Sequence, residues 1–168
     1  LPDVVSFEQG ACLGIPAMTA HRCLFADGPV AGKNVLVTGG AGVVGHYAIQ
    51  LAKWAGATVV TTVSSAAKAA HARAAGADVV ISYREENVVE RIQATLGGID
   101  RVIDVDFGKN LPLTAAVLNP FAAITCYASM SVREPAFPYD KLLRLNVSVR
   151  PVFVYTMSDT AKAQAQAD

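Results

Sequence analysis

The chain has 168 residues, which is enough for one domain with a sizeable hydrophobic core. Hydrophobic residues make up 52% of the chain and charged residues only 17%, yet no unbroken apolar run approaches the roughly 18 residues that span a bilayer. The 14 basic and 14 acidic residues give a formal net charge of zero, which argues against a nucleic-acid or membrane partner.

The first thirty residues stand apart from the pattern that follows them. Ser6–Gln9 has the spacing of a capping box, and Ile15–Phe25 is predicted to be a helix that leads into the domain. No signal peptide is recognisable, and the final residues, AKAQAQAD, have the composition of a helix interior. We therefore expect the sequence to be part of a longer protein.

From there on, short apolar runs alternate with helical segments. The predicted strands are Val35–Val37, Thr58–Val63, Val79–Ser82, Arg101–Val105, Ala122–Tyr127 and Val147–Tyr155. The predicted helices are Val43–Ala55, Ser65–Ala75, Glu86–Leu96, Leu113–Leu118 and Tyr139–Arg144. This alternation, with right-handed crossovers, predicts an α/β fold of the Rossmann type. Its doubly wound parallel six-stranded sheet would have helices on both faces and the order 3-2-1-4-5-6.

A glycine-rich turn joins the first strand to its helix. Gly40–Gly45 matches G-x-G-x-x-G, and Gly39 adds a second glycine frame. One glycine permits the tight turn, the next lets the backbone approach a pyrophosphate, and the third lets helix and strand pack closely. The residues expected to contact the pyrophosphate are Gly40, Gly42, Val43, Val44 and Gly45.

A P-loop and a short-chain dehydrogenase are both disfavoured by the residues around this turn. A P-loop would continue with G-K-[ST], which is absent. A short-chain dehydrogenase needs a lysine four residues after a tyrosine, which no tyrosine here has.

The end of the second strand holds hydroxyls and an ammonium where NAD-binding proteins usually place a carboxylate. Ser64 and Ser65 can donate hydrogen bonds, and Lys68 follows one helical turn later. The end of the third strand would add the Tyr83 hydroxyl and the Arg84 guanidinium beside them. These groups suit the 2′-phosphate of NADP(H), which is the cofactor we predict. The alternative is that Ser65 only caps the next helix and Lys68 is a solvated side chain.

Several segments resemble one family. The glycine turn with its flanks, VLVTGGAGVVGHYAIQLAKWAGATVV (35–60), and AAGADVVISYREENVVERI (74–92) are similar to the quinone oxidoreductase, zeta-crystallin-like branch of the medium-chain dehydrogenase/reductase superfamily. LGIPAMTAHRCLF (13–25), IDVDFGKNLP (103–112) and VFVYTM (152–157) add to the resemblance.

The resemblance implies a Rossmann cofactor domain paired with a GroES-like catalytic domain, and the zinc-independent reduction of quinones or activated alkenes by NADPH. Residues 1–30 would be lead-in helices from a catalytic domain that this chain lacks, and residues 31–168 the NADP-binding domain. We expect the chain alone to keep a cofactor-binding surface but to lack quinone turnover. The resemblance also implies a homodimer through the edge strand, Val147–Tyr155.

The resemblance assigns further residues by position. Ser64, Lys68 and Tyr83 match the 2′-phosphate site, and Phe107 with Gly108 matches the adenine side. The residues expected near the nicotinamide or approaching the cofactor are Tyr127, Ala128, Ser129 and Thr19.

No catalytic residue can be assigned from the sequence. His46 begins the helix after the glycine turn and could lie near the phosphates or serve only in packing, while Asp104 and Asp106 alternate along one strand. Three cysteines lie far apart with no C-x-x-C pair, so no metal site is predicted and a reducing, cytoplasmic setting is expected. Two alternatives stay open: a noncatalytic nucleotide-binding or crystallin-like module, and the cofactor domain of a zinc alcohol dehydrogenase.

Overall fold

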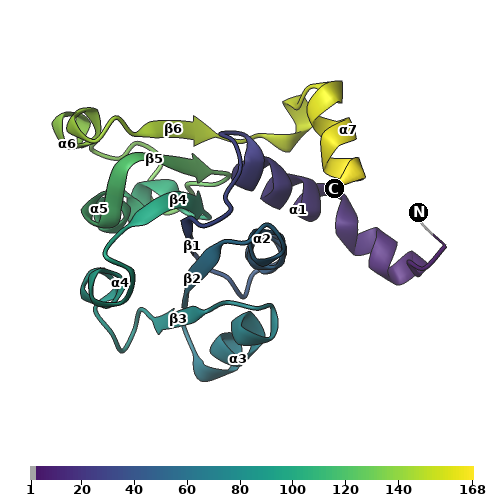
Figure 1. Cartoon of the computed structure of the whole chain (residues 1–168), viewed down its shortest axis with the longest axis horizontal. Coiled ribbons are helices and arrows are strands. Elements are labelled where there is room, and N and C mark those ends of the chain that lie inside the picture. Colours follow the sequence, from purple (N-terminus) through teal and green to yellow (C-terminus); the bar gives the residue numbers. More distant parts are fainter. Residues whose placement is uncertain (1–2) are drawn as a thin grey trace.

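A six-stranded sheet in the order β3-β2-β1-β4-β5-β6 forms the centre of the computed structural model, which describes residues 3–168 (Figure 1). The strands are β1 (Asn34–Val37), β2 (Thr58–Val63), β3 (Val79–Ser82), β4 (Ile99–Asp104), β5 (Leu118–Cys126) and β6 (Ser148–Pro151). Every neighbouring pair runs parallel, which confirms the predicted sheet and its order. The chain reverses its direction of winding between β1 and β4, so a crevice opens at the carboxyl ends of these two strands.

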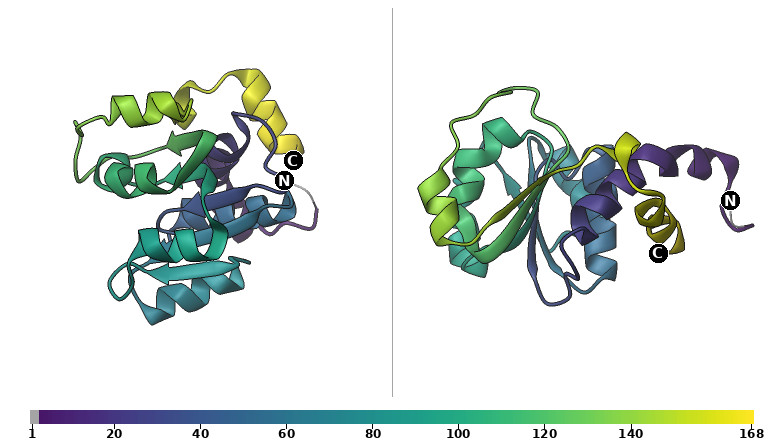
Figure 2. Two further views of the ribbon diagram at one scale, coloured as in Figure 1. Left: turned by 60° about the vertical axis from the view of Figure 1, so that its left-hand side comes forward. Right: turned by 90° about the horizontal axis from the view of Figure 1, so that it is seen from above.

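Helices cover both faces of the sheet (Figure 2). One face carries α1 (Phe7–Phe25), α2 (Val43–Trp54) and α3 (Ala66–Ala74). The other face carries α4 (Val88–Leu96), α5 (Phe107–Val117) and α6 (Tyr139–Arg144). After β6 the chain makes a short 3₁₀ helix, η1 (Val154–Thr156), and ends in α7 (Asp159–Ala167), which lies beside α1. No helix within residues 3–168 is both long and apolar enough to cross a membrane.

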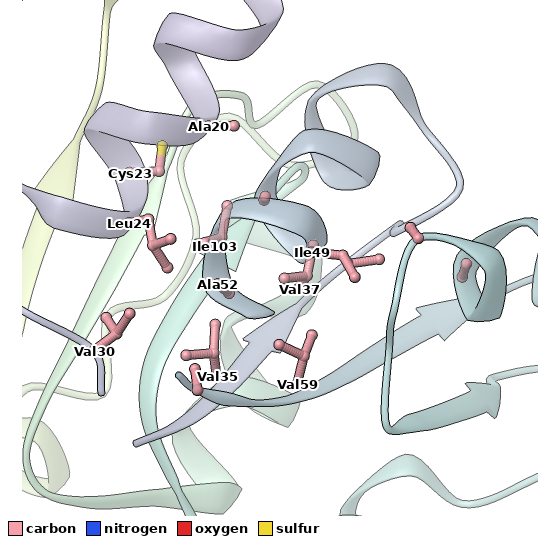
Figure 3. Close-up of a cluster of buried hydrophobic side chains, with 14 of the residues drawn as sticks. Ala20, Cys23, Leu24, Val30, Val35, Val37, Ile49, Ala52, Val59 and Ile103 are labelled. Carbon is pink, nitrogen blue, oxygen red and sulfur yellow. The ribbon is translucent and has the colours of Figure 1, made fainter. Parts of the chain in front are cut away.

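The strands are buried on both faces, so their apolar residues serve two separate cores. Val35 and Val37 pack on the side of α1 and α2, whereas Leu36 packs on the side of α4 and α5. The second half of α1 belongs to the first core through fully buried Cys23 and Leu24 (Figure 3). This half of the lead-in helix is thus part of the domain's packing.

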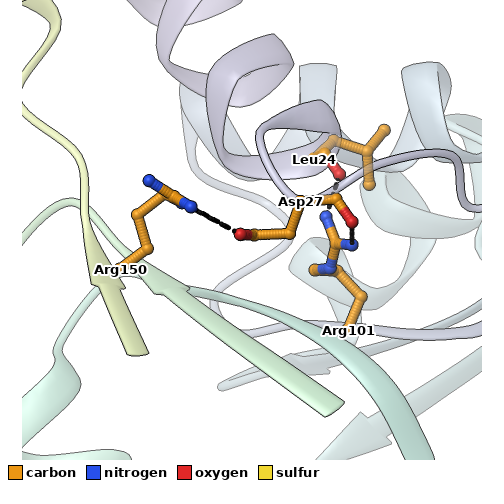
Figure 4. A network of polar contacts seen from close by, with 4 residues as sticks. All are labelled: Leu24, Asp27, Arg101 and Arg150. Carbon is orange, nitrogen blue, oxygen red and sulfur yellow. Dashed lines mark hydrogen bonds and ion pairs between the residues drawn. The ribbon is translucent and has the colours of Figure 1, made fainter. Parts of the chain in front are cut away.

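A buried arginine joins α1 to the sheet. The guanidinium of Arg101, on β4, donates to the backbone oxygens of Leu24 and Asp27, with 2.9 Å to the latter (Figure 4). The Asp27 carboxylate accepts in turn from Arg150 of β6, at 2.6 Å from Nη2. Hydrogen bonding from Arg150 holds the pKa of Asp27 below its ordinary value, although partial burial opposes the shift. One network therefore ties the end of α1 to a central strand and to the edge strand.

The predicted helix ends and caps are mostly close to those observed. Ser6 and Gln9 form the expected capping box, and Ser65 caps α3. The starts of two helices were placed wrongly. α1 starts at Phe7 rather than at the predicted Ile15. It is kinked at Gly14 and continues through Pro16, so the predicted helix is only its second half. α5 starts at Phe107 rather than Leu113, because Pro112 is accommodated inside the helix.

The predicted strand over Val147–Tyr155 is too long. β6 is a four-residue strand at the sheet edge, and its ladder with β5 ends where Pro151, which has no N–H, lies opposite Cys126. Beyond it the chain turns into η1, which buries Val154. The edge position was predicted correctly, but the exposed ladder is short.

Phe121 in β5 has a backbone conformation that suits glycine. Its φ is 62°, its side chain is 79% exposed, and its N–H donates to Leu145 O at 2.7 Å. Because the left-handed region costs a residue with a Cβ roughly 1–2 kcal/mol, Phe121→Gly should raise the free energy of unfolding by about 0.5–1 kcal/mol after the entropy of glycine is counted. Urea denaturation measures this change. Asn146→Gly (φ 51°) is the control and should gain less, because asparagine tolerates this region; equal or opposite shifts would contradict the account.

Candidate functional site

The turn between β1 and α2 lies at the carboxyl edge of the sheet, next to the crevice. Gly39 has a φ of 67°, so this residue, one before the G-x-G-x-x-G frame, makes the tight turn. Its N–H donates to Thr62 Oγ1 at 3.2 Å, and the N–H of Gly40 donates to Thr62 O at 3.3 Å. The turn is therefore bonded to the neighbouring strand β2, in the position where the sequence predicts a phosphate.

The three glycines of the frame differ in how much space a side chain would find at each of them. A Cβ on Gly45 would lie 2.6 Å from Gly39 O and 2.8 Å from Gly40 Cα, so this glycine lets the helix pack on the turn. A Cβ on Gly40 would lie 2.1 Å from Thr61 Oγ1. Gly42 is different, since its nearest neighbour would be Gly39 O at 3.3 Å. Internal packing thus requires Gly40 and Gly45 more strongly than Gly42.

The first turn of α2 is open to an anion. Its N-cap residue is Gly42, which supplies no side-chain hydrogen bond, and no acidic residue occupies the first helical turn. The N–H groups of Val43, Val44 and Gly45 have no hydrogen-bond partner within residues 3–168. Free amides at a helix N-terminus favour a phosphate, so the residues present fit the pyrophosphate predicted from the sequence.

A small cavity of about 150 Å³ lies beside this turn and collects the predicted 2′-phosphate residues. Its lining includes Gly42, Ser64, Lys68 and Tyr83. Lys68 Nζ donates to Ser64 Oγ at 3.1 Å, so an ammonium and a hydroxyl already face one another there. Ser65 is not part of the lining, because its hydroxyl accepts from the N–H of Lys68 at 3.4 Å and caps α3. The alternative considered for Ser65, a helix cap, is the arrangement observed.

A second cavity of about 390 Å³ adjoins the first and shares Gly39, Thr62 and Tyr83 with it. It lies between the ends of β1 and β4 and the first turns of α5. The residues that complete it on the β4 and α5 side are Val105, Asp106, Lys109, Asn110 and Leu113. These residues were not assigned to the site from the sequence, since the predicted start of α5 comes after most of them. The segment IDVDFGKNLP (103–112) was the available signal, because it spans the end of a strand.

The remaining predicted residues lie outside these two cavities. Phe107 packs against the core on the side of α4 and α5, and the Ala128 carbonyl accepts its N–H at 2.9 Å. Tyr127 packs partly into the other core, where burial raises the pKa of its hydroxyl. Thr19 is buried on α1 and its hydroxyl donates to Ile15 O at 2.7 Å. The structure thus places Tyr127 and Ala128 at the carboxyl edge without bringing them to the phosphate end.

A larger, separate cavity lies elsewhere. It holds about 700 Å³ between α1, α2 and α7, and its lining is mainly apolar, with Leu13, Met18 and Leu51 among its members. None of the predicted cofactor residues lines it, so its size does not make it the candidate site. Within the described part of the chain, no cluster of three His, Cys, Asp or Glu side chains could hold a metal ion.

His46 and His71 stack on one another between α2 and α3. Their ring centroids are 4.2 Å apart and the planes differ by 20°. Burial lowers the pKa of His46 below its ordinary value, and the neighbouring His71 lowers it further. Of the two roles considered for His46, the observed contact is packing, and the residue directly follows the three free amides.

Known proteins similar to this chain include several oxidoreductases. The sequence model of a family described as zinc-binding dehydrogenase matches residues 43–167. The quinone oxidoreductase of Rattus norvegicus is 38% identical over 114 residues, which cover 66% of this chain and 35% of that protein. The chloroplastic NADPH-dependent alkenal/one oxidoreductase of Arabidopsis thaliana is 32% identical over an alignment that covers 96% of this chain and 44% of that protein.

Solved structures show the same relationship. The quinone oxidoreductase of Thermus thermophilus, which was also solved with NADPH, aligns with a TM-score of 0.87 and 28% identity over 99% of this chain. The Escherichia coli quinone oxidoreductase complexed with NADPH aligns with a TM-score of 0.85 and 27% identity, also over 99% of this chain. The chain spans 54% and 53% of those two proteins, so it corresponds to about half of each.

Two substitutions in the glycine frame should separate folding from binding. In Gly40→Ala the new Cβ meets Thr61 Oγ1, which cannot move easily because it donates to Val37 O at 2.6 Å, so the free energy of unfolding should fall by about 1–3 kcal/mol. Gly42→Ala should leave stability within about 1 kcal/mol of the original while weakening NADPH binding about tenfold, because the backbone can no longer approach the pyrophosphate. Denaturation and calorimetric titration measure the two effects. A Gly42→Ala protein with undiminished affinity would contradict the assignment.

The histidine pair predicts a pH dependence of stability. Because the pKa of His46 is lowered on folding, the unfolded chain binds the proton first as the pH falls. Its contribution to stability is complete above the ordinary pKa of about 6.5 and is lost as the pH falls from there through the lowered folded-state value. The free energy of unfolding should therefore drop between pH 7.5 and 5.5, and less steeply in His46→Leu. His71→Ala should show an intermediate slope, and parallel profiles for all three proteins would disprove the prediction.

Proposed function

The chain belongs to the zinc-binding dehydrogenase family, in its quinone oxidoreductase branch, and on that premise we propose that it binds NADPH for hydride transfer to a quinone or an activated alkene. It is the cofactor-binding part of such an enzyme, in the medium-chain dehydrogenase/reductase superfamily. The observation that carries the choice of NADPH over NADH is the small cavity in which Lys68 and Ser64 face one another.

The charge balance at the end of β2 supports this choice. A 2′-phosphate carries close to two negative charges, and an ammonium with a hydroxyl donor can bind it through charge-assisted hydrogen bonds. A carboxylate at this point would bind the ribose hydroxyls of NADH and repel the phosphate, and no acidic residue lines the cavity. The Tyr83 hydroxyl, half exposed at the end of β3, gives a further donor.

The placement of the rest of the dinucleotide follows from the arrangement of residues along the carboxyl edge of the sheet. The free amides of α2 hold the pyrophosphate, and the adjoining cavity beside β4 receives the adenine against Val105 and Leu113. Tyr127 and Ala128, at the end of β5, lie toward the nicotinamide, which supplies the hydride when the cofactor is bound. These residues bind and orient, and we assign quinone turnover to the whole protein rather than to this chain alone.

We assign a second copy of the chain as a partner through the edge of the sheet. β6 has no neighbour on its outer side within the described chain, and Phe153 and Tyr155 beyond it are 65% and 66% exposed, with ring centroids 5.1 Å apart. Unpaired strand edges and exposed aromatic pairs favour association. Because β6 is short, the aromatic residues after it would supply much of that contact.

Lys68→Ala tests the cofactor assignment. Removing the ammonium should raise the Kd for NADPH about tenfold or more while changing the Kd for NADH by less than about twofold, because only NADPH carries the 2′-phosphate. Calorimetric titration of the chain with each cofactor gives both values. Lys141→Ala, which removes an exposed lysine on α6, is the control and should change neither value. Equal weakening of both cofactors by Lys68→Ala would remove the argument.

A further inference from the structure

The carboxyl group of Asp104, at the crevice, is buried although one of its oxygens has no hydrogen-bond partner within residues 3–168. Asp104 is the last residue of β4 and is fully inaccessible to solvent. Its Oδ1 accepts three hydrogen bonds, from Thr38 Oγ1 at 3.0 Å, from the N–H of Asp106 at 2.9 Å and from Asn110 Nδ2 at 2.7 Å. Its Oδ2 is buried and has no partner within residues 3–168.

This arrangement is costly for folding alone. No lysine, arginine or histidine of the described chain forms an ion pair with Asp104, and burial raises its pKa despite the three donors. Buried carboxyls without a cationic partner are unfavourable, and an apolar side chain of similar size would fill the space without an unpartnered oxygen. The three hydrogen bonds on a single oxygen indicate that Asp104 holds the surrounding residues in fixed positions.

The donors come from the two walls of the crevice. Thr38 directly precedes the glycine turn, and its Oγ1 both donates to Asp104 and accepts from the N–H of Val105 at 3.0 Å. Val105 in turn lies close to the turn itself, because a Cβ on Gly39 would come within 3.1 Å of Val105 Cγ1. The resulting ring of contacts runs from the end of β1 through Asp104 to the start of α5 and back to the glycine turn.

Both walls line the larger cavity of the site. Thr38 and Gly39 lie on one side of it, and Asp106 and Asn110 lie on the other. Asp104 lines neither cavity, so it reaches the ligand space only through the residues that it holds.

We propose that Asp104 is a positioning residue for the dinucleotide, which fixes the separation of the glycine turn from the β4–α5 turn by holding Thr38 and Asn110 on one oxygen. The inference rests on the proposed function. A ligand that binds the glycine turn and the β4–α5 cavity together depends on this separation.

Substitutions at both ends of the contact separate positioning from general stability. Asp104→Asn keeps one acceptor oxygen for the three donors that Oδ1 accepts from, so the Kd for NADPH should stay within about threefold. Asp104→Leu removes the acceptor and should raise that Kd at least about tenfold in protein whose circular dichroism is native at the temperature of the titration. Thr38→Val removes both the donor to Asp104 and the acceptor of the Val105 N–H, with little change in volume, and should raise the Kd about threefold to tenfold.

A matched control is available on α5. Thr114 is fully buried and its hydroxyl has no partner within the described residues, so Thr114→Val makes the same chemical change outside the ring of contacts. It should leave the Kd for NADPH unchanged. A purely structural role would show lower thermal stability in the Asp104 and Thr38 variants with an unchanged Kd, and would not predict rescue by asparagine.

The outcomes are distinct. Native-like Thr38→Val protein with an unchanged Kd overturns the proposal even if Asp104→Leu fails to fold, and so does an Asp104→Asn protein as weak as Asp104→Leu. In both cases the unsubstituted chain still binds NADPH and the proposed function stands. An unsubstituted chain that binds no NADPH overturns both.

Discussion

The close approach of the first turn of α2 to the end of β1 is the constraint on which the site depends. Gly45 packs so near Gly39 O and Gly40 Cα that any side chain would push the helix away. This contact sets the N-terminus of α2, with its free amides, beside the carboxyl end of a buried strand. The two cores on either side of the sheet hold β1 in place, so the orientation of these amides is fixed by most of the domain.

Polar groups at the neighbouring strand ends then give the edge its chemistry. The end of β2 supplies an ammonium and a hydroxyl, and the end of β3 supplies a phenol. The end of β4 supplies a buried carboxyl that holds the turns on either side of the crevice. No strand contributes more than a few polar atoms, yet parallel strands bring all of them to one edge. The larger cavity by α1 and α7 differs from this edge, because its lining is mainly apolar and its His21 and Asp168 side chains pair with one another.

The sequence predicted most of the fold and the phosphate end of the site for physical reasons. Strands and helices alternate along the chain with different hydrophobic periods, and this alternation allowed the sheet order to be derived. Few structures combine this glycine spacing with a strand before it and a helix after it, so the turn at Gly40–Gly45 could be recognised. Ser64, Lys68 and Tyr83 were predicted to meet because the strands that precede them are neighbours.

What the sequence missed depends on tertiary packing. Lys109 and Asn110 were overlooked because the predicted helix began at Leu113, whereas α5 begins at Phe107 and contains Pro112. The stacking of His46 on His71 joins two helices and leaves no local pattern. Phe107, which the resemblance assigns to the adenine side, packs against a core, a contact that no local pattern in the sequence indicated.

Calorimetric titration of the unsubstituted chain with NADPH and with NADH tests the central claim most directly. We expect NADPH to bind at least about tenfold more tightly, because a doubly charged phosphate meets an ammonium at the end of β2. Equal affinity for the two cofactors, or tighter binding of NADH, would contradict this claim.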